Sequence, residues 1–293
     1  MFRIGGSALR RSLDELCDRG QRIEIAELAA RLLALDSPIE RELARRLVAA
    51  ALDRPAAELP SELGPEHLRP AGEIAVQAIP LESADFVVVD LETTGLGASA
   101  AILEIGAVRI SQLQLGDRFD SLVRPPGPVP ARITELTGIS DPLLADAPPA
   151  AEVLPAFRSW LASAPRAVFV AHNAEFDSGF LVRAFAEQQL APFDSPVLCT
   201  RKLARRVLPA LGRYSLDALC AAFGISNGAR HRALGDALAT ARALLWLLPQ
   251  ARDEHSAASL GELFDLQRRP LPRRRRRRSS RAQRGSAAPG PAP

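Results

Sequence analysis

An α/β fold is predicted for the middle of this 293-residue chain, and three observations predict it. The continuous β-branched run Phe86–Asp90 is typical of a strand buried on both faces. Two further strand candidates follow in succession, at residues 102–110 and 119–124. Helical patterns then alternate with short apolar runs as far as residue 248, which indicates a mixed sheet with helices packed on it.

The remaining elements of this part of the chain are read from their apolar periodicity. They are a helix at 152–161, a strand at 167–171, a helix at 176–185, a strand at 197–199, and helices near 200–208, 215–223 and 233–248. Together with the first three strands they predict one domain over residues 80–250.

The two ends of the chain differ from this domain. Residues 1–75 predict a small helical region, in which Ser37-Pro38-Ile39-Glu40 reads as a capping box before a helix whose apolar face includes Leu43. Residues 253–293 lose the periodicity and contain the unbroken arginine run at 273–278. Because dense like charges repel one another and cannot form a core, this tail is predicted to be disordered.

The net charge of +3 conceals an uneven distribution. Ten arginines lie between residues 268 and 284 and no acid follows Asp265, which leaves a net charge of −7 for residues 1–267. The Arg-rich tail is predicted to attract a phosphate backbone through a sequence-independent and salt-sensitive interaction. The alternative is a tail that only keeps the protein in solution.

Several classes of protein are excluded by composition. The chain contains no apolar stretch of signal-peptide or membrane-span length. The three cysteines, Cys17, Cys199 and Cys220, are scattered and show neither disulfide nor zinc-site spacing. The sequence therefore predicts a cytoplasmic protein that makes no contact with membranes.

The first candidate site is a pair of acids at the end of the buried strand. Asp90 and Glu92 are two residues apart, and alternation along an extended chain places their side chains on the same side. Carboxylate oxygens in such a pair suit hard divalent cations such as Mg²⁺ and Mn²⁺. Taken alone, the pair is better explained as exposed carboxylates at the end of a strand.

Two later segments add acids and a histidine. Asp177 falls in the first turn of a predicted helix, where the helix dipole favours an anion. His231 and Asp236 stand at the start of the last predicted helix of the domain. Each of these residues, taken alone, also has an ordinary structural explanation.

Taken together, the segments resemble the DEDD-type 3′–5′ exonucleases, in the subgroup whose last motif carries histidine. The resemblance is greatest to the proofreading (epsilon) subunits of bacterial DNA polymerase III and covers residues 84–248. The segments that carry it are Val-Val-Asp90-Leu-Glu92-Thr-Thr-Gly, Glu104-Ile105-Gly106-Ala107-Val108, Leu136-Thr137-Gly138-Ile139, Ala171-His172-Asn173-Ala174-x-Phe176-Asp177 and His231-x-Ala233-x-x-Asp236.

This resemblance implies a ribonuclease-H-like mixed sheet with flanking helices and a two-metal phosphodiesterase. The residues that would hold two Mg²⁺ or Mn²⁺ ions are Asp90, Glu92, Asp177 and Asp236. His231 would be the general base, because an imidazole with its ordinary pKa of about 6.5 accepts a proton at neutral pH.

The resemblance also implies substrate contacts. Thr93, Thr94 and Leu96 match positions that hold the terminal nucleotide through backbone or hydroxyl groups and an apolar wedge. Asn173 and Phe176 match positions that contact the strand, although Phe176 is equally explained as a core residue of its helix. His172 is interpreted as a residue that positions this loop.

The function implied is a metal-dependent 3′–5′ exonuclease that acts on single-stranded or frayed DNA 3′ ends in proofreading or repair. DNA polymerase subunits are candidate partners. One alternative is an exoribonuclease, which the paired Thr93 and Thr94 disfavour, because oligoribonucleases usually have methionine at the first of these positions. The other is an inactive scaffold of the same fold, which the presence of all five catalytic residues disfavours.

Overall fold

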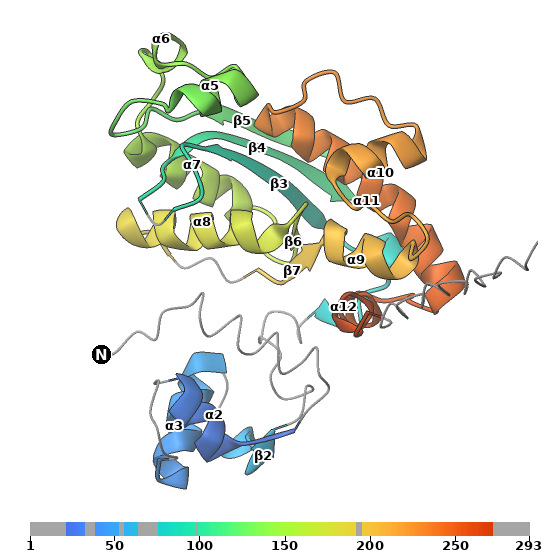
Figure 1. Cartoon of the computed structure of the whole chain (residues 1–293). Helices are drawn as coiled ribbons and strands as arrows, with labels where there is room; N and C mark the ends of the chain where they lie inside the picture. The colour runs from blue at the N-terminus through green and yellow to red at the C-terminus, as the bar shows by residue number, and fades with distance from the viewer. Residues whose placement is uncertain are drawn as a thin grey trace, which may run out of the picture.

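The structure is a computed structural model that describes residues 22–32, 39–52, 56–63, 76–97, 99–191 and 195–271. A five-stranded sheet covered by helices on both faces lies at its centre (Figure 1). Its strands are β3 (Phe86–Thr93), β4 (Ile102–Ser111), β5 (Gln114–Leu122), β6 (Val168–Ala171) and β7 (Val197–Cys199).

The sheet is mixed, as predicted, and its strand order is β5-β4-β3-β6-β7. The first three strands in the chain form an antiparallel meander, in which Asp90 pairs with Gly106 of β4. The strands β6 and β7 continue the sheet in parallel with β3, so the carboxyl ends of these three strands meet at one edge. Ligand and active sites of sheets that contain parallel strands lie at this edge.

Alternation along β3 sends its side chains into two cores. Phe86 and Val88 join the core on one face of the sheet, whereas Val87, Val89 and Leu91 join the core on the other. The helices of the first face are α9 (Thr200–Val207), α10 (Leu216–Phe223), α11 (Ala233–His255) and α12 (Leu260–Arg268). Those of the second face are α7 (Ala150–Ala162) and α8 (Ala174–Glu187).

Three short elements of the domain have no apolar periodicity and were not predicted. They are the 3₁₀ helix η2 (Leu81–Ser83) and the helices α5 (Ala131–Thr137) and α6 (Asp141–Leu144). Ile139 and Leu144, in the segment after α5 and in α6, pack with Leu103 of β4 in a small separate cluster. A helix of four to seven residues shows too few turns for a periodic pattern, so tertiary packing rather than local sequence defines these elements.

The disorder predicted from residue 253 onward is wrong for residues 253–271. Helix α11 continues to His255, and α12 begins with a capping box between Ser259 and Glu262. Leu263 and Phe264 of α12 are fully buried. The Gln267 side chain accepts a hydrogen bond from the Cys199 amide and donates one to the Val197 carbonyl, so α12 covers the edge strand β7. Residues 272–293, with the arginine run, lie outside the described residues.

The N-terminal residues that the structure describes form a small unit with its own core. Its elements are β1 (Ile23–Glu24), α2 (Ile25–Leu32), α3 (Arg41–Leu52), the 3₁₀ helix η1 (Ala56–Glu58) and β2 (Glu62–Leu63). The place predicted for Leu43 on the apolar face of the second helix is wrong, because Leu43 is 50% exposed and Ala44 and Val48 are buried instead. The Glu40 carboxylate accepts hydrogen bonds from the Glu42 and Leu43 amides, whereas Ser37 lies outside the described residues.

No helix among the described residues combines the length and hydropathy that are required to cross a membrane.

Candidate active site

The predicted acidic residues stand at the same edge of the sheet. Asp90 and Glu92 belong to the last half of β3, on the side of the strand that Val88 presents to α11. Asp177 is in the first turn of α8, which follows the carboxyl end of β6. Asp236 is in the first turn of α11. Three separate elements therefore direct carboxylates to one place.

The structure brings the five predicted catalytic residues together. One ligand atom each from Glu92, His231 and Asp236 lies within 4.8 Å of the others. Asp90 is close enough to Asp177, Asp236 and Glu92 for their charges to raise its pKa. The fold thus brings together acids that lie more than 80 positions apart in the sequence.

Burial and mutual repulsion raise the pKa values of Asp90, Glu92 and Asp177. The pKa of Asp90 lies well above its usual range, first because the group is buried and then because of Asp177, Asp236 and Glu92. Burial, with Asp236 and Glu104, raises the pKa of Glu92 to about 7, although Arg232 opposes the shift. Burial raises the pKa of Asp177 to about 8 against hydrogen bonds from backbone amides.

A site of this kind fits divalent metal ions. Several carboxylates share a small, largely buried volume, and their charged forms repel one another unless a cation lies between them. The donors are carboxylate oxygens with one imidazole, which is a ligand set suited to Mg²⁺ or Mn²⁺. The candidate metal-holding residues are therefore Asp90, Glu92, Asp177 and Asp236, with His231 beside them.

The loop before α11 orients both Asp236 and His231. The Asn227 side-chain amide donates to one carboxylate oxygen of Asp236 at 2.5 Å, and the His231 backbone amide donates to the other at 3.1 Å. His231 itself has a φ of 57°, in the left-handed region that few non-glycine residues adopt. This turn places the imidazole next to Asp90, Glu92, Asp177 and Asp236, here called the acidic cluster, directly before α11 begins.

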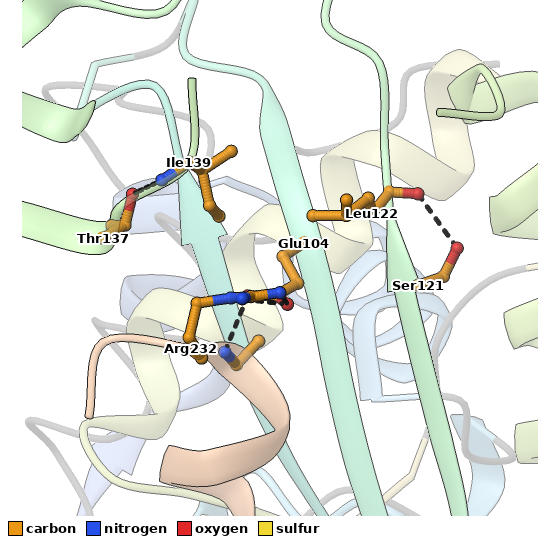
Figure 2. A network of polar contacts seen from close by, with 7 residues as sticks. Glu104, Ser121, Leu122, Thr137, Ile139 and Arg232 are labelled. Carbon is orange, nitrogen blue, oxygen red and sulfur yellow. Dashed lines mark hydrogen bonds and ion pairs between the residues drawn. The ribbon is translucent and has the colours of Figure 1, made fainter. Parts of the chain in front are cut away.

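A buried acid on the neighbouring strand anchors the start of α11. Glu104 of β4 is 1% exposed and accepts hydrogen bonds from the Arg232 guanidinium, with an Nη2–Oε1 distance of 2.6 Å (Figure 2). The same carboxylate accepts from the Ala233 backbone amide at 2.9 Å. This contact spans 128 residues of sequence and fixes the segment between His231 and Asp236.

Helix α11 also approaches β4 unusually closely at Gly106. A Cβ atom at this position would lie 2.0 Å from the Leu234 nitrogen and 2.1 Å from the Ala233 carbonyl carbon. Only glycine leaves room for the helix backbone here. Glu104 and Gly106 were noted in the sequence as parts of a motif without an assigned role, and the structure assigns both to the docking of α11.

The end of β3 and the loop that follows it carry three predicted substrate-binding residues, and the structure shows different surroundings for each. The Thr93 hydroxyl donates to the Gly95 carbonyl, and the Thr94 hydroxyl accepts from the Ala101 amide. Both hydroxyls therefore close the loop itself. Leu96 is 82% exposed at its tip, so the loop offers an apolar side chain to solvent.

The second predicted substrate-binding segment begins α8. Asn173 is exposed, with a φ of 87°, and its side-chain oxygen lies 3.5 Å from the Arg201 guanidinium. Phe176 is half-buried and its ring centroid lies 4.7 Å from that of Phe180, so part of it belongs to the core. His172 is held through both ring nitrogens, at 2.9 Å from the Thr200 hydroxyl and 2.9 Å from the Tyr214 carbonyl.

Comparison with known proteins decides the family. A family model described as an exonuclease of the RNase T type matches residues 87–244, which is more than half of the chain. The chain belongs to this exonuclease family. The match includes every residue of the acidic cluster, and the fold is that of the ribonuclease-H-like exonucleases of the DEDD type.

The chain is similar to bacterial DNA polymerase III proteins. It is 45% identical over 185 residues to a DNA polymerase III subunit epsilon-like protein of Rhodobacter capsulatus, an alignment that covers 61% of this chain and 26% of that protein. It is 39% identical over 188 residues to the PolC-type DNA polymerase III of Halalkalibacterium halodurans, covering 64% of this chain and 13% of that protein. The chain thus spans about a quarter or less of the length of these relatives.

Solved structures show the same fold. Escherichia coli exonuclease I in complex with a dT13 oligonucleotide superposes with a TM-score of 0.53 at 17% identity, covering 59% of this chain and 43% of that one. The nuclease domain of 3′hExo, a DEDDh family member bound to rAMP, superposes with a TM-score of 0.52 at 20% identity, covering 58% of this chain and 94% of that one.

Proposed function

We propose that this chain is a 3′–5′ exonuclease that removes nucleotides from the 3′ ends of DNA with the aid of two divalent metal ions. The observation that carries the proposal is the convergence of Asp90, Glu92, Asp177, Asp236 and His231 at one edge of the sheet. Membership of the exonuclease family and the similarity to polymerase III relatives support the same reaction.

The acids and the histidine have separate roles in this proposal. Asp90, Glu92, Asp177 and Asp236 hold Mg²⁺ or Mn²⁺, which when bound activate water and stabilise the charge on the leaving 3′ oxygen. His231 takes the proton of the attacking water at its imidazole. Asn227 and the His231 amide fix both oxygens of Asp236, so this ligand is oriented before a metal ion arrives.

The substrate in this proposal is a single-stranded or frayed DNA 3′ end. Leu96, exposed at the tip of the loop after β3, provides an apolar surface for the last base. Thr93 and Thr94 contact the nucleotide through the bonding capacity that the loop leaves to their hydroxyls, because the Thr93 hydroxyl can still accept and the Thr94 hydroxyl can still donate a hydrogen bond. Asn173 and the exposed part of Phe176 contact the strand from the start of α8.

We further propose a role in proofreading or repair, with DNA polymerase subunits as candidate partners. The support is the similarity to an epsilon-like protein and to PolC-type polymerases, of which the chain matches only a part. The Arg-rich tail, whose arginine run at 273–278 lies outside the described residues, is proposed to attract the phosphate backbone without regard to sequence.

Digestion of an end-labelled strand tests the reaction. The full chain with Mn²⁺ is expected to shorten a 5′-labelled single-stranded DNA in single-nucleotide steps from its 3′ end. The variant Asp90→Ala is expected to be slower by at least about a hundredfold, because a charge-stabilising group of the centre is removed. Asp146→Ala, which removes an exposed acid after α6, is the matched control and is expected to keep the parent rate.

Equal digestion by the parent and Asp90→Ala would place the chemistry elsewhere. A matched RNA strand in the same assay tests the substrate class. Faster shortening of the RNA than of the DNA would replace DNA by RNA as the substrate while leaving the centre in place.

A further inference from the structure

The exposed side of α9 is cationic and lies beside the active site. This helix follows β7 directly at the edge of the sheet, opposite the β5 edge (Figure 1). Its apolar side, with Leu203, Ala204 and Val207, is buried in the core. Its other side, here called the α9 basic face, consists of the half-buried residues Arg201, Lys202, Arg205 and Arg206.

Neutral groups hold two cations of the α9 basic face. Arg201 contacts the side-chain oxygen of Asn173, and the Arg205 guanidinium lies 5.8 Å from the ring centroid of Tyr214. Among the described residues, neither of these arginines forms an ion pair with a carboxylate. Their positions are therefore defined while their positive charge is not neutralised.

The α9 basic face is tied rigidly to the active-site loop. His172, which follows β6, bonds Thr200 at the start of α9 and the carbonyl of Tyr214 after it. Arg201 in turn reaches Asn173, which lies one helical turn before Asp177. A strand that leaves the acidic cluster past Asn173 therefore meets the cations of α9 next.

We propose that the α9 basic face binds the phosphodiester backbone of the single-stranded DNA segment that lies 5′ of the nucleotide being removed. The inference rests on the proposed function, which places a DNA 3′ end at the acidic cluster. Guanidinium groups form charge-assisted hydrogen bonds with phosphate oxygens. Arg201 and Arg205 stand one helical turn apart, about 6 Å along the axis, so one extended strand can contact both.

The net charge of residues 1–267, which already includes the α9 cations, opposes the approach of a polyanion. Residues 1–267 carry a net charge of −7, and the acidic cluster itself repels a polyanion until metal ions are bound. A local group of cations at the entrance of the strand offsets this repulsion. The α9 basic face therefore supplies attraction within the folded domain, independently of the Arg-rich tail.

Salt-dependent binding tests the inference. The full-length double variant Arg201→Ala/Arg205→Ala is compared with the parent by fluorescence anisotropy of a labelled 12-nucleotide single-stranded DNA, in Ca²⁺ and at 50–200 mM KCl. Losing two phosphate contacts is expected to reduce the slope of log K against log salt by about 1.4, and to weaken binding about tenfold at low salt. The double variant Arg118→Ala/Arg166→Ala removes the same charge from exposed positions on β5 and before β6, and is expected to keep the parent slope.

A small substrate separates this inference from the proposed function. The nitrophenyl ester of thymidine 5′-monophosphate has no 5′ extension, so the α9 double variant and its control double variant are both expected to hydrolyse it at the parent rate. Equal salt slopes for the α9 variant and its control would overturn the inference, and hydrolysis of the ester would then leave the proposed function standing. Failure of the parent to hydrolyse both the ester and DNA would overturn the proposed function, while the anisotropy slopes would still decide whether α9 binds the strand. A slope change confined to a matched RNA strand would also overturn the inference.

Discussion

His231 contributes two different groups to the site, its imidazole and its backbone amide. Its imidazole belongs to the same group as Glu92 and Asp236, so its position suits both a general base and a metal ligand. Its backbone amide, by contrast, has a definite task, because it donates to Asp236 and holds that carboxylate in place. Side-chain substitution therefore removes the imidazole while leaving the backbone contact available.

The variant His231→Gln distinguishes the two roles. A general base contributes to turnover rather than to metal binding, so the rate at saturating DNA and Mn²⁺ is expected to fall by about 10²–10⁴-fold. The Mn²⁺ concentration at half-maximal rate is expected to stay at the parent value. A loss of Mn²⁺ affinity as large as that of Asp236→Asn would instead make the imidazole a ligand.

Site residues could be predicted from sequence where they belong to a short local motif. Their contacts with residues far away in the sequence could not. The acids and His231 stand in short segments with a strand or helix context, and the structure brings them together. Glu104 contacts Arg232 across 128 residues, and nothing in the sequence near either residue indicates the pair. Thr93 and Thr94 were predicted to hold the terminal nucleotide through backbone or hydroxyl groups, and the turn that their hydroxyls close could be seen only in three dimensions.

At the scale of elements, the docking of α11 on β4 decides whether the site is assembled. This one helix carries Asp236 in its first turn, and Gly106 of the strand allows its backbone to approach. Because the clash involves backbone atoms rather than a flexible side chain, an added methyl group cannot be accommodated by rotation.

The variant Gly106→Ala is therefore expected to lower the free energy of unfolding by about 1–3 kcal/mol or more. It is also expected to reduce nuclease activity further than the loss of folded protein explains, because Asp236 is displaced. Gly116→Ala on β5 is the matched control, since its Cβ would meet only ordinary contacts at 3.8 Å or more. Denaturant unfolding and activity per folded molecule provide the two measurements, and equal stability of the two variants would contradict this view of the docking.

Elements with strong periodicity were predictable, and those defined by tertiary contacts were not. The buried run of β3 and the apolar helices α7 and α8 were located from sequence to within a few residues. Helix α12 was missed because it lies beside the arginine run, and the overall charge of the segment concealed its capping box and its buried Leu263 and Phe264.

At the scale of the whole molecule, the acidic cluster links folding, pH and metal ions. Glu92 and Asp177 titrate near 7 and 8 in the folded protein, against about 4 in an unfolded chain. The metal-free folded state therefore holds more protons than the unfolded state between about pH 4 and 8. The contribution of Glu92 and Asp177 to the free energy of unfolding is therefore greatest below about pH 4 and is lost as the pH rises to about 8. Bound divalent ions replace the lost protons and restore this stability.

The measurement that tests the central claim most directly is a calorimetric titration of Mn²⁺ into the metal-free protein at pH 6.5 and 8, in buffers of different protonation enthalpy. If the four carboxylates form the metal centre, Mn²⁺ binding releases protons at pH 6.5 and is tighter at pH 8. It is then abolished in the variant Asp90→Asn/Asp236→Asn and retained in Asp146→Asn. Binding to that double variant with the parent affinity, or parent binding without proton release, would contradict the assignment of this cluster as a metal centre.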